Sequence, residues 1–402
     1  MAEIAALLSD INPAADAVFE EAGLEVVRFP KDISPAGLID LASDAQIVGV
    51  RSGPALPAEL FETSKTLQAV GCFCVGHGHV ASKEAANLGV PVFNSAFENT
   101  RAVAEYVVGS AFSLLRRLHE HNSSLHEGTW TKTDEQSYEL LGKTVGVVGY
   151  GATGSQAASM LELLGMSVIF YDPAPKFPKQ SRAERVESMA ALLEQADVVT
   201  LHVPGGQTVM TAEAISQMKP GSYLINTSRG EAIDDEAVAE ALASGHLAGF
   251  AGDVFRDEPR RKGESFSHVL QRYPNALLTP HVAGSSIEAQ RNIGIETAKR
   301  LVGYIATGST MGAVNVGEIG LGSVVRGTHR VLQFHSNTPG AAQAVDGVFA
   351  NFGLNIERQR LETKNGVGYV ATDVLFVPQE ALNAIKALEQ TIRVRAIFGE
   401  YT

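Results

Sequence analysis

The sequence predicts an α/β protein with two doubly wound parallel sheets, followed by a small C-terminal module of order βαββαβ. Strand-like apolar runs alternate with helical segments through residues 1–98, and the same alternation resumes at Val145. Repeated βα units with short connections form parallel sheets. A glycine-rich segment, 317–327, then separates these two sheets from a C-terminal region whose elements follow a different order.

Composition narrows the class of protein before any motif is considered. The chain has 402 residues, of which 45% are hydrophobic and 19% charged, so two or three folded domains are expected. A net charge of −13 argues against a general binder of nucleic acid or of anionic membranes. No long apolar run or basic leader is present, so we expect a soluble, cytoplasmic protein. Cys72 and Cys74 are too few for a disulfide framework or a zinc site.

Residues 1–98 are expected to form the first parallel sheet. A helix should start at Asn12-Pro13, and others should lie near Leu60 and Ala85. In parallel sheets, ligands bind beyond the carboxyl ends of the strands, where Arg51 and the loop His77–His79 fall. The expected strands are Ile4–Leu8, Leu24–Phe29, Ile47–Val50, Leu67–Val75 and Val90–Phe93.

The stretch Val145–Asp172 predicts a dinucleotide site. It contains a strand, the turn Gly149-x-Gly151-x-x-Gly154, a helix, a second strand and an acid. Gly149 permits the turn, Gly151 lets the backbone approach a pyrophosphate, and Gly154 lets helix and strand pack closely. The helix start offers free N–H groups to phosphate. Asp172 would accept ribose hydroxyls and repel a 2′-phosphate, so NAD is favoured over NADP.

The rest of this second sheet is framed by two long helices, Thr100–Arg117 and Ser286–Thr307. Asp234 should begin a helix and Gly245 should end it. The helix after Ser286 can return the chain to the first domain, which we therefore expect to be discontinuous. Its expected strands are Val145–Gly149, Val168–Tyr171, Val198–Val203, Tyr223–Asn226, Ala248–Val254 and Leu277–Leu278.

Beyond the expected linker 317–327, the pattern predicts a ferredoxin-like module with its helices on one face. Asn365-Gly366 is a hairpin signal. The expected strands are Arg330–Phe334, Leu354–Leu361, Val367–Val374 and Ile392–Ile397, and the helices are Pro339–Phe352 and Glu380–Leu388. The expected domains are 1–98 with 285–325, then 99–284, then 326–402.

Three residues at strand ends could carry chemistry with a nicotinamide. Hydride transfer from an alcohol requires a base for the hydroxyl proton, and histidine suits this near neutral pH. His281 follows an apolar strand, Arg229 could bind a carboxylate bidentately, and Glu258 could orient an imidazole. Taken singly, His281 could be an ordinary loop histidine, Arg229 a surface or capping arginine, and Glu258 a solvated turn acid.

Together these segments resemble the D-isomer-specific 2-hydroxyacid dehydrogenases, in particular short bacterial members with a C-terminal ACT domain. The signature segments are Asn226–Gly230, Gly252–Phe255 with Glu258-Pro259, and Thr279–His281. The resemblance covers nearly the whole chain and implies two Rossmann- or flavodoxin-like domains. Further matching segments are Arg51-Ser52, Gly71–Gly76, Asn99–Glu105, Gly128–Lys132, Leu201–Pro204 and Ala289–Gly294.

This resemblance implies NAD-dependent oxidation of 3-phospho-D-glycerate, a phosphorylated 2-hydroxy acid, at the first step of L-serine biosynthesis. Arg229 would be the carboxylate clamp, His281 the acid/base and Glu258 its partner. Arg51 and Ser52 would meet the substrate, and Lys132 would add charge near its phosphate. Besides the three glycines, cofactor contacts would come from Ala152, Thr153, Asp172, Thr227, Ser228, Arg229, Asp253, His281, Val282, Ala283 and Gly284.

The resemblance also implies L-serine as an effector, held by His335, Asn337 and Asn355 and acting through movement along the linker. It implies a homotetramer as well. The residues are also consistent with purely structural roles, in which Asn337 caps a helix and Asn355 begins a strand.

The chain departs from the family pattern at two places in the expected substrate cleft. Gly53 stands where relatives commonly carry a second arginine, and His77-Gly78-His79 replaces a more usual polar segment; no metal site is expected there. A reductase of another 2-oxo acid, such as hydroxypyruvate, glyoxylate or 2-oxoglutarate, is therefore an open alternative. A non-catalytic NAD sensor or corepressor, or a serine-binding regulatory protein, would use the same fold without turnover.

Overall fold

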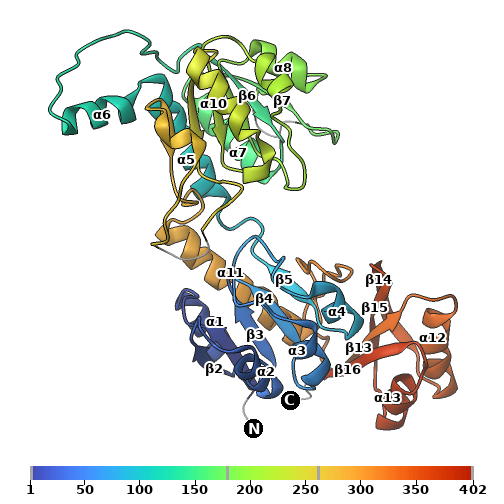
Figure 1. Cartoon of the computed structure of the whole chain (residues 1–402). Coiled ribbons are helices and arrows are strands. Elements are labelled where there is room, and N and C mark those ends of the chain that lie inside the picture. Colours follow the sequence, from blue (N-terminus) through green and yellow to red (C-terminus); the bar gives the residue numbers. More distant parts are fainter. Residues whose placement is uncertain (1–2, 178–180, 260–262, 400–402) are drawn as a thin grey trace. The chain divides into compact units, whose positions relative to one another are not determined.

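The computed structural model describes residues 3–177, 181–259 and 263–399. The chain forms two compact units: unit 1 comprises residues 1–98 and 290–402, and unit 2 comprises residues 99–289 (Figure 1). The chain thus leaves unit 1 after Glu98 and returns to it at Gln290. The domain boundaries expected from the sequence stay a prediction.

The first sheet of unit 1 is parallel, with strand order β2-β1-β3-β4-β5, so the predicted doubly wound class is confirmed. All residues of β3 and β4 are buried, as expected where helices cover both faces of a sheet. Its elements are β1 (Glu3–Leu8), α1 (Ala14–Glu21), β2 (Leu24–Phe29), α2 (Pro35–Asp44), β3 (Ile47–Val50), α3 (Ala58–Thr63), β4 (Ala69–Cys72), α4 (Ser82–Asn87) and β5 (Val92–Asn94).

Unit 2 is built on a parallel sheet of order β12-β11-β10-β9-β6-β7-β8. One core packs α5 and α7 on this sheet and a second packs α8, α9 and α10, so both faces are covered. The strands are β6 (Thr144–Val148), β7 (Ser167–Tyr171), β8 (Glu184–Arg185), β9 (Val198–Leu201), β10 (Ser222–Asn226), β11 (Leu247–Gly252) and β12 (Ala276–Leu278). The helices are α5 (Thr100–Leu115), α6 (Leu118–His126), α7 (Ala152–Leu163), α8 (Met189–Gln195), α9 (Ala212–Ser216), η1 (Gly230–Ala232), α10 (Asp235–Ser244) and η2 (Val269–Arg272).

The predicted ends of α10 are confirmed. The Asp234 carboxylate accepts the Ala237 N–H at 3.2 Å, and Gly245 closes the helix with a left-handed φ of 74°. A glycine at that position avoids the clash that a side chain meets at positive φ. A single long helix, α11 (Ile287–Thr307), follows the second sheet.

The C-terminal region is an antiparallel sheet of order β14-β15-β13-β16, which confirms the predicted βαββαβ module. α12 and α13 pack on one face around Val345, Phe349 and Ile385. Phe334 and Tyr369, on strands of the same sheet, join the core of the parallel sheet of unit 1. Its elements are β13 (His329–Ser336), α12 (Ala341–Asn351), β14 (Ile356–Lys364), β15 (Val367–Val374), α13 (Gln379–Lys386) and β16 (Thr391–Phe398).

The glycine-rich segment 317–327 has specific partners along its first half. Thr310 Oγ1 donates to the Gly317 carbonyl at 2.8 Å, and Arg330 Nη1 donates to the Gly322 carbonyl at 2.7 Å. Ile319 is almost fully buried. Any regulatory movement along this segment would have to break these contacts.

The sequence analysis did not predict α6, which ends before a stretch without regular structure. None of its residues is buried, and Leu118 and Leu125 are among the exposed apolar side chains. In the part of the chain that the structure describes, no helix is long and apolar enough to cross a membrane.

Candidate active site

The glycine turn between β6 and α7 has the geometry that a dinucleotide requires. Gly149 has a φ of 91°, and a Cβ there would lie 2.3 Å from the His202 carbonyl oxygen. A Cβ on Gly154 would lie 2.1 Å from the Gly149 carbonyl oxygen, so helix and turn touch directly. By contrast, a Cβ on Gly151 would meet nothing within 4 Å. Open space at this glycine beside the N-terminus of α7, where Ala152 and Thr153 begin the helix, fits a pyrophosphate.

Asp172 follows β7 and reaches back to this turn. Its Oδ2 accepts the N–H of Tyr150 at 2.8 Å, and its Oδ1 accepts the N–H of Ala174 at 2.9 Å. The carboxylate is therefore held beside the glycine turn, and it keeps lone pairs that could accept the hydroxyl groups of a ribose. These features fit NAD, and they keep a negative charge where NADP would bring a phosphate.

Arg229 lies on the turn after β10, which Asn226 holds together. The Asn226 amide donates to the Arg229 carbonyl at 2.9 Å, and its Oδ1 accepts the Ser228 hydroxyl at 2.8 Å. Thr227 Oγ1 is buried and has no hydrogen-bond partner in the described part of the chain. The Arg229 side chain is exposed, and its Nη1 donates to the Ser228 carbonyl at 2.7 Å. A guanidinium presented in this way can bind a carboxylate.

Asp253, which directly follows β11, organises the segment that bears His281. Its Oδ1 accepts the Thr279 hydroxyl at 2.5 Å and the Val282 N–H at 2.9 Å, and its Oδ2 accepts the Ala283 N–H at 2.8 Å. The side chain is only 1% exposed. Asp253 therefore fixes the backbone of 279–283, whereas its predicted cofactor contact stays a prediction.

His281 is paired with Glu258. Its Nδ1 lies 2.8 Å from Glu258 Oε2, and Glu258 Oε1 accepts the Phe255 N–H at 2.9 Å. The imidazole is 58% exposed and can meet a substrate. His281 has a φ of 54°, a left-handed backbone that costs a non-glycine residue energy. The hydrogen bonds from its N–H to the carbonyls of Asp253 and Thr279 hold it there.

The pair shifts the acidity of both side chains. The hydrogen bond that His281 donates to Glu258 raises the pKa of His281, in spite of partial desolvation. Burial alone would raise the pKa of Glu258, but the hydrogen bonds from His281 and from the Phe255 N–H bring the pKa below its usual value. The positive charge of Arg229 acts on both groups and lowers each pKa. The structure thus brings together the three residues predicted for chemistry.

The residues predicted for substrate binding belong to both units. Arg51, in unit 1, donates to Gln290 Oε1 at 2.9 Å and lies 3.5 Å from Asp10 Oδ2. Ser52 directly follows it. Lys132, in unit 2, is exposed on the stretch after α6. Neither the Asp10 nor the Gln290 contact was predicted, because both depend on tertiary packing.

Two further features near the site were missed by sequence reasoning. Tyr106, on α5, donates its hydroxyl proton to Thr279 Oγ1 at 2.5 Å, since that oxygen already donates to Asp253. Gly284 packs on Asn99, whose Nδ2 would lie 2.4 Å from a Cβ at position 284. The Thr279-Pro280-His281 motif drew attention to Thr279, but nothing in the sequence identifies Tyr106 as its partner.

The fold and the site define a dehydrogenase that uses a nicotinamide dinucleotide. Residues 108–283 match the sequence profile of the D-isomer specific 2-hydroxyacid dehydrogenase NAD binding domain. The chain belongs to the D-isomer specific 2-hydroxyacid dehydrogenase family, and its cofactor is NAD. The predicted family, reaction class and cofactor are therefore confirmed.

Two curated relatives and one solved structure illustrate the similarity. The D-3-phosphoglycerate dehydrogenase of Escherichia coli (strain K12) is 41% identical over 399 residues, which cover 98% of this chain and 97% of the relative. The D-3-phosphoglycerate dehydrogenase of Dictyostelium discoideum is 38% identical over 396 residues, covering 98% and 96%. A solved D-2-hydroxyisocaproate dehydrogenase is 25% identical, with a TM-score of 0.71, and covers 78% of this chain and 99% of that chain.

Proposed function

We propose that this chain oxidises 3-phospho-D-glycerate to 3-phosphohydroxypyruvate with NAD, at the first step of L-serine biosynthesis. The observation that carries the proposal is the 2.8 Å contact between His281 and Glu258, with the charge of Arg229 beside both. Relatives named D-3-phosphoglycerate dehydrogenase that align over 98% of this chain support the choice of substrate.

In this proposal each side chain has a separate role. The glycine turn and Asp172 would hold NAD, which would supply the acceptor for the hydride from C2 of the substrate. Because His281 Nδ1 is engaged by Glu258, Nε2 is the nitrogen that takes the C2 hydroxyl proton. Glu258 stabilises the imidazolium that forms, and Arg229 holds the substrate carboxylate bidentately.

The substrate phosphate requires a local positive charge in a chain of net charge −13. Arg51 and Lys132 supply it in this proposal, and Ser52 adds a hydroxyl donor. Arg51 already has the Asp10 carboxylate within 3.5 Å, so part of its charge is compensated before substrate arrives.

One observation favours an unphosphorylated 2-oxo acid as the second candidate. Burial and the neighbouring His77 lower the pKa of His79, so His79 is neutral near pH 7. A neutral imidazole does not supply the positive charge that a second arginine at the position of Gly53 would provide. A weaker phosphate site would make a smaller acid competitive.

The serine site that we propose requires two copies of the chain. His335 pairs with Gly368 near one end of β15, whereas Asn355 precedes Ile356, which pairs with Val374 at the other end. Asn337 lies close to His335 in sequence and is exposed. His335 Nδ1 is buried and has no partner in the described residues. A ligand that contacts all three side chains therefore needs Asn355 from a second copy.

Assembly into a homotetramer is part of the same proposal. The exposed apolar side chains Leu118, Leu125 and Trp130 support it, because they gather on α6 and the residues just beyond it. Trp130 is 80% exposed, which is unusual for so large an apolar group.

Steady-state rates over a panel of substrates test the proposal. The panel contains 3-phospho-D-glycerate, D-glycerate, D-lactate and D-2-hydroxyglutarate with NAD, each with and without L-serine. The expected result is the highest kcat/KM for the phosphorylated acid and a lower rate in the presence of serine. Equal kcat/KM for D-glycerate would reject the phosphate assignment, and a rate insensitive to serine would reject the regulatory part.

A further inference from the structure

A second histidine–carboxylate pair, His268 and Asp235, connects the loop that carries Glu258 to the start of α10. This loop joins β11 to η2, and its described residues are 253–259 and 263–268. We propose that His268 and Asp235 are positioning residues that fix this loop and so keep Glu258 against His281. The inference rests on the roles proposed above for Glu258 and His281.

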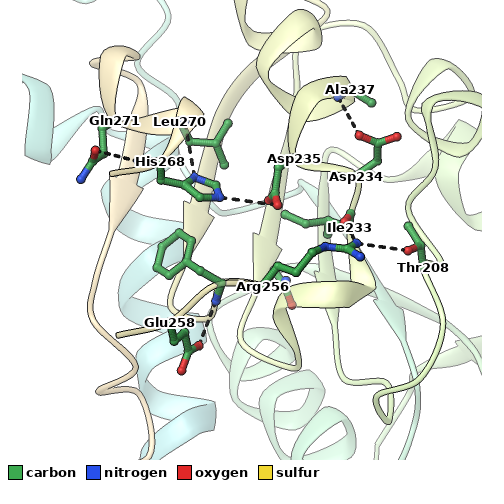
Figure 2. A network of polar contacts seen from close by, with 12 residues as sticks. Thr208, Ile233, Asp234, Asp235, Ala237, Arg256, Glu258, His268, Leu270 and Gln271 are labelled. Atoms are coloured by element: carbon green, nitrogen blue, oxygen red, sulfur yellow. Dashed lines mark hydrogen bonds and ion pairs between the residues drawn. The ribbon is translucent and has the colours of Figure 1, made fainter. Parts of the chain in front are cut away.

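His268 ties the end of the loop to the start of α10 (Figure 2). Its Nε2 lies 3.5 Å from Asp235 Oδ2, and its Nδ1 accepts the Leu270 N–H at 3.4 Å. The His268 N–H donates to Gln271 Oε1 at 3.0 Å, which completes a reciprocal cap on η2. Because Nδ1 is an acceptor, the neutral ring carries its proton on Nε2 and points it at Asp235.

The imidazole ring of His268 also packs against the residue that binds Glu258. Phe255 meets the ring edge-on, with centroids 5.0 Å apart, and Phe266 stacks on it at 5.6 Å. Phe255 in turn donates its N–H to Glu258 Oε1 at 2.9 Å. A continuous set of contacts therefore runs from Asp235 through His268 and Phe255 to Glu258.

The same stretch of loop is fixed from its other side by the turn of Arg229. A Cβ on Gly230 would lie 2.1 Å from the carbonyl carbon of Phe255, so the two backbones are in direct contact. Arg256 adds bonds of 3.4 Å to the Ile233 carbonyl and 3.5 Å to Thr208 Oγ1 (Figure 2). A shift of Phe255 would therefore move Glu258 relative to both Arg229 and His281.

Packing alone does not account for a polar pair at this place. The side chains of His268 and Asp235 are only 11% and 18% exposed, although an open cleft of about 460 Å³ lies beside them. Burial raises the pKa of Asp235, the interactions with His268 and Arg256 oppose that increase, and Asp234 adds to it. A partly buried carboxylate is costly unless it has a partner. His268 supplies that partner, and the contact fixes one orientation of the ring.

Three substitutions at two positions separate positioning from packing. His268→Phe keeps an aromatic ring against Phe255 and Phe266 but removes the contact to Asp235. Asp235→Leu removes the carboxylate, whereas Asp235→Asn keeps an oxygen that accepts the Nε2 proton and serves as the conservative variant. His246→Gln is the matched control, because His246 Nε2 contacts the Ile215 carbonyl at 2.9 Å elsewhere in unit 2.

The readouts are kcat, KM and the titration of His281. NMR of histidine-labelled full-length protein measures the titration. The charged groups that act on His281 are Glu258, Asp253 and Arg229, and the Glu258 hydrogen bond is the largest influence on its pKa. His268→Phe and Asp235→Leu should therefore lower the pKa of His281 and reduce kcat by roughly 10- to 100-fold. KM for NAD should stay unchanged, since β6 and β7 carry the glycine turn and Asp172.

Asp235→Asn and His246→Gln should leave both the titration and kcat near wild type. The proposal is overturned if His268→Phe binds NAD normally and shows an unaltered His281 titration, or if Asp235→Asn and Asp235→Leu behave alike. If the wild-type protein does not oxidise 3-phospho-D-glycerate, the proposed function fails, but the NMR titration still decides the role of His268 and Asp235.

Discussion

His281 Nδ1 lies 2.8 Å from Glu258 Oε2, and this contact raises the pKa of the imidazole while it lowers that of the carboxyl group. In the proposed reaction, the neutral imidazole is the form that accepts the hydroxyl proton during oxidation. The rise of the oxidation rate with increasing pH therefore reports the pKa of His281.

Glu258→Gln removes the charge that favours the imidazolium. The rise of kcat/KM with pH for oxidation should move to lower pH, because the pKa of His281 falls. In the reduction direction the protonated ring is required, so the loss of activity at high pH should also begin earlier. Initial rates across pH in both directions check this, and an unmoved profile would exclude Glu258 as the partner.

Two glycine substitutions should separate folding from cofactor binding. Gly154→Ala places a Cβ 2.1 Å from the Gly149 carbonyl oxygen and should destabilise the protein by about 1–3 kcal/mol. Gly151→Ala meets nothing within 4 Å and should leave the free energy of unfolding within about 0.5 kcal/mol of wild type.

Because the Gly151 Cβ would enter the expected pyrophosphate position, Gly151→Ala should weaken NAD binding by about tenfold, or about 1.4 kcal/mol. Urea unfolding and calorimetric titration with NAD provide the two measurements. A Gly151→Ala variant with unchanged NAD affinity would place the pyrophosphate elsewhere.

Asp172 should control the choice between the two nicotinamide dinucleotides. Asp172→Ser removes a charge that repels a 2′-phosphate and a carboxylate that accepts ribose hydroxyls. The ratio of kcat/KM for NAD over NADP should fall by about tenfold or more. Steady-state rates with each dinucleotide measure this ratio, and an unchanged ratio would show that Asp172 does not meet the ribose.

His202 should make the fold sensitive to acid. Burial lowers the pKa of His202 to about 4, whereas a histidine in the unfolded chain titrates near 6.5. The unfolded state therefore binds a proton before the folded state does, and stability should fall as pH drops from about 6.5 to about 4. The loss attributable to this residue is on the order of a few kcal/mol.

His202→Gln should reduce this dependence on pH without reversing it, because burial also lowers the pKa of His79 and of His335. The free energy of unfolding, measured in urea at several pH values for both proteins, gives the comparison. Parallel curves for the variant and the wild type would exclude His202 as the source.

The sequence predicted those elements whose ends are determined locally. Asp234 and Gly245 bound α10 through one side-chain bond and one left-handed φ, and Asn365-Gly366 forms its hairpin for the same kind of reason. α6 was missed because its residues Leu118–His126 include none that is buried, so no apolar face marked it.

The candidate site was predicted as a set of residue types but not as a set of contacts. Arg229, Glu258 and His281 were each placed at strand ends, and the structure adds the loop contacts that bring them together. His335 and Asn355 lie near opposite ends of β15. This placement depends on the register of β13, β14 and β15, which could not be predicted from the sequence. The same holds for His268 and Asp235, since no motif links them.

The most direct test is a single-turnover measurement with protein already bound to NAD. After mixing with 3-phospho-D-glycerate, the wild-type protein should form NADH at a rate that His281→Asn lowers by about 10²- to 10⁴-fold, with NAD affinity unchanged. Equal rates of NADH formation in the two proteins would contradict the assignment of His281 as the residue that accepts the hydroxyl proton.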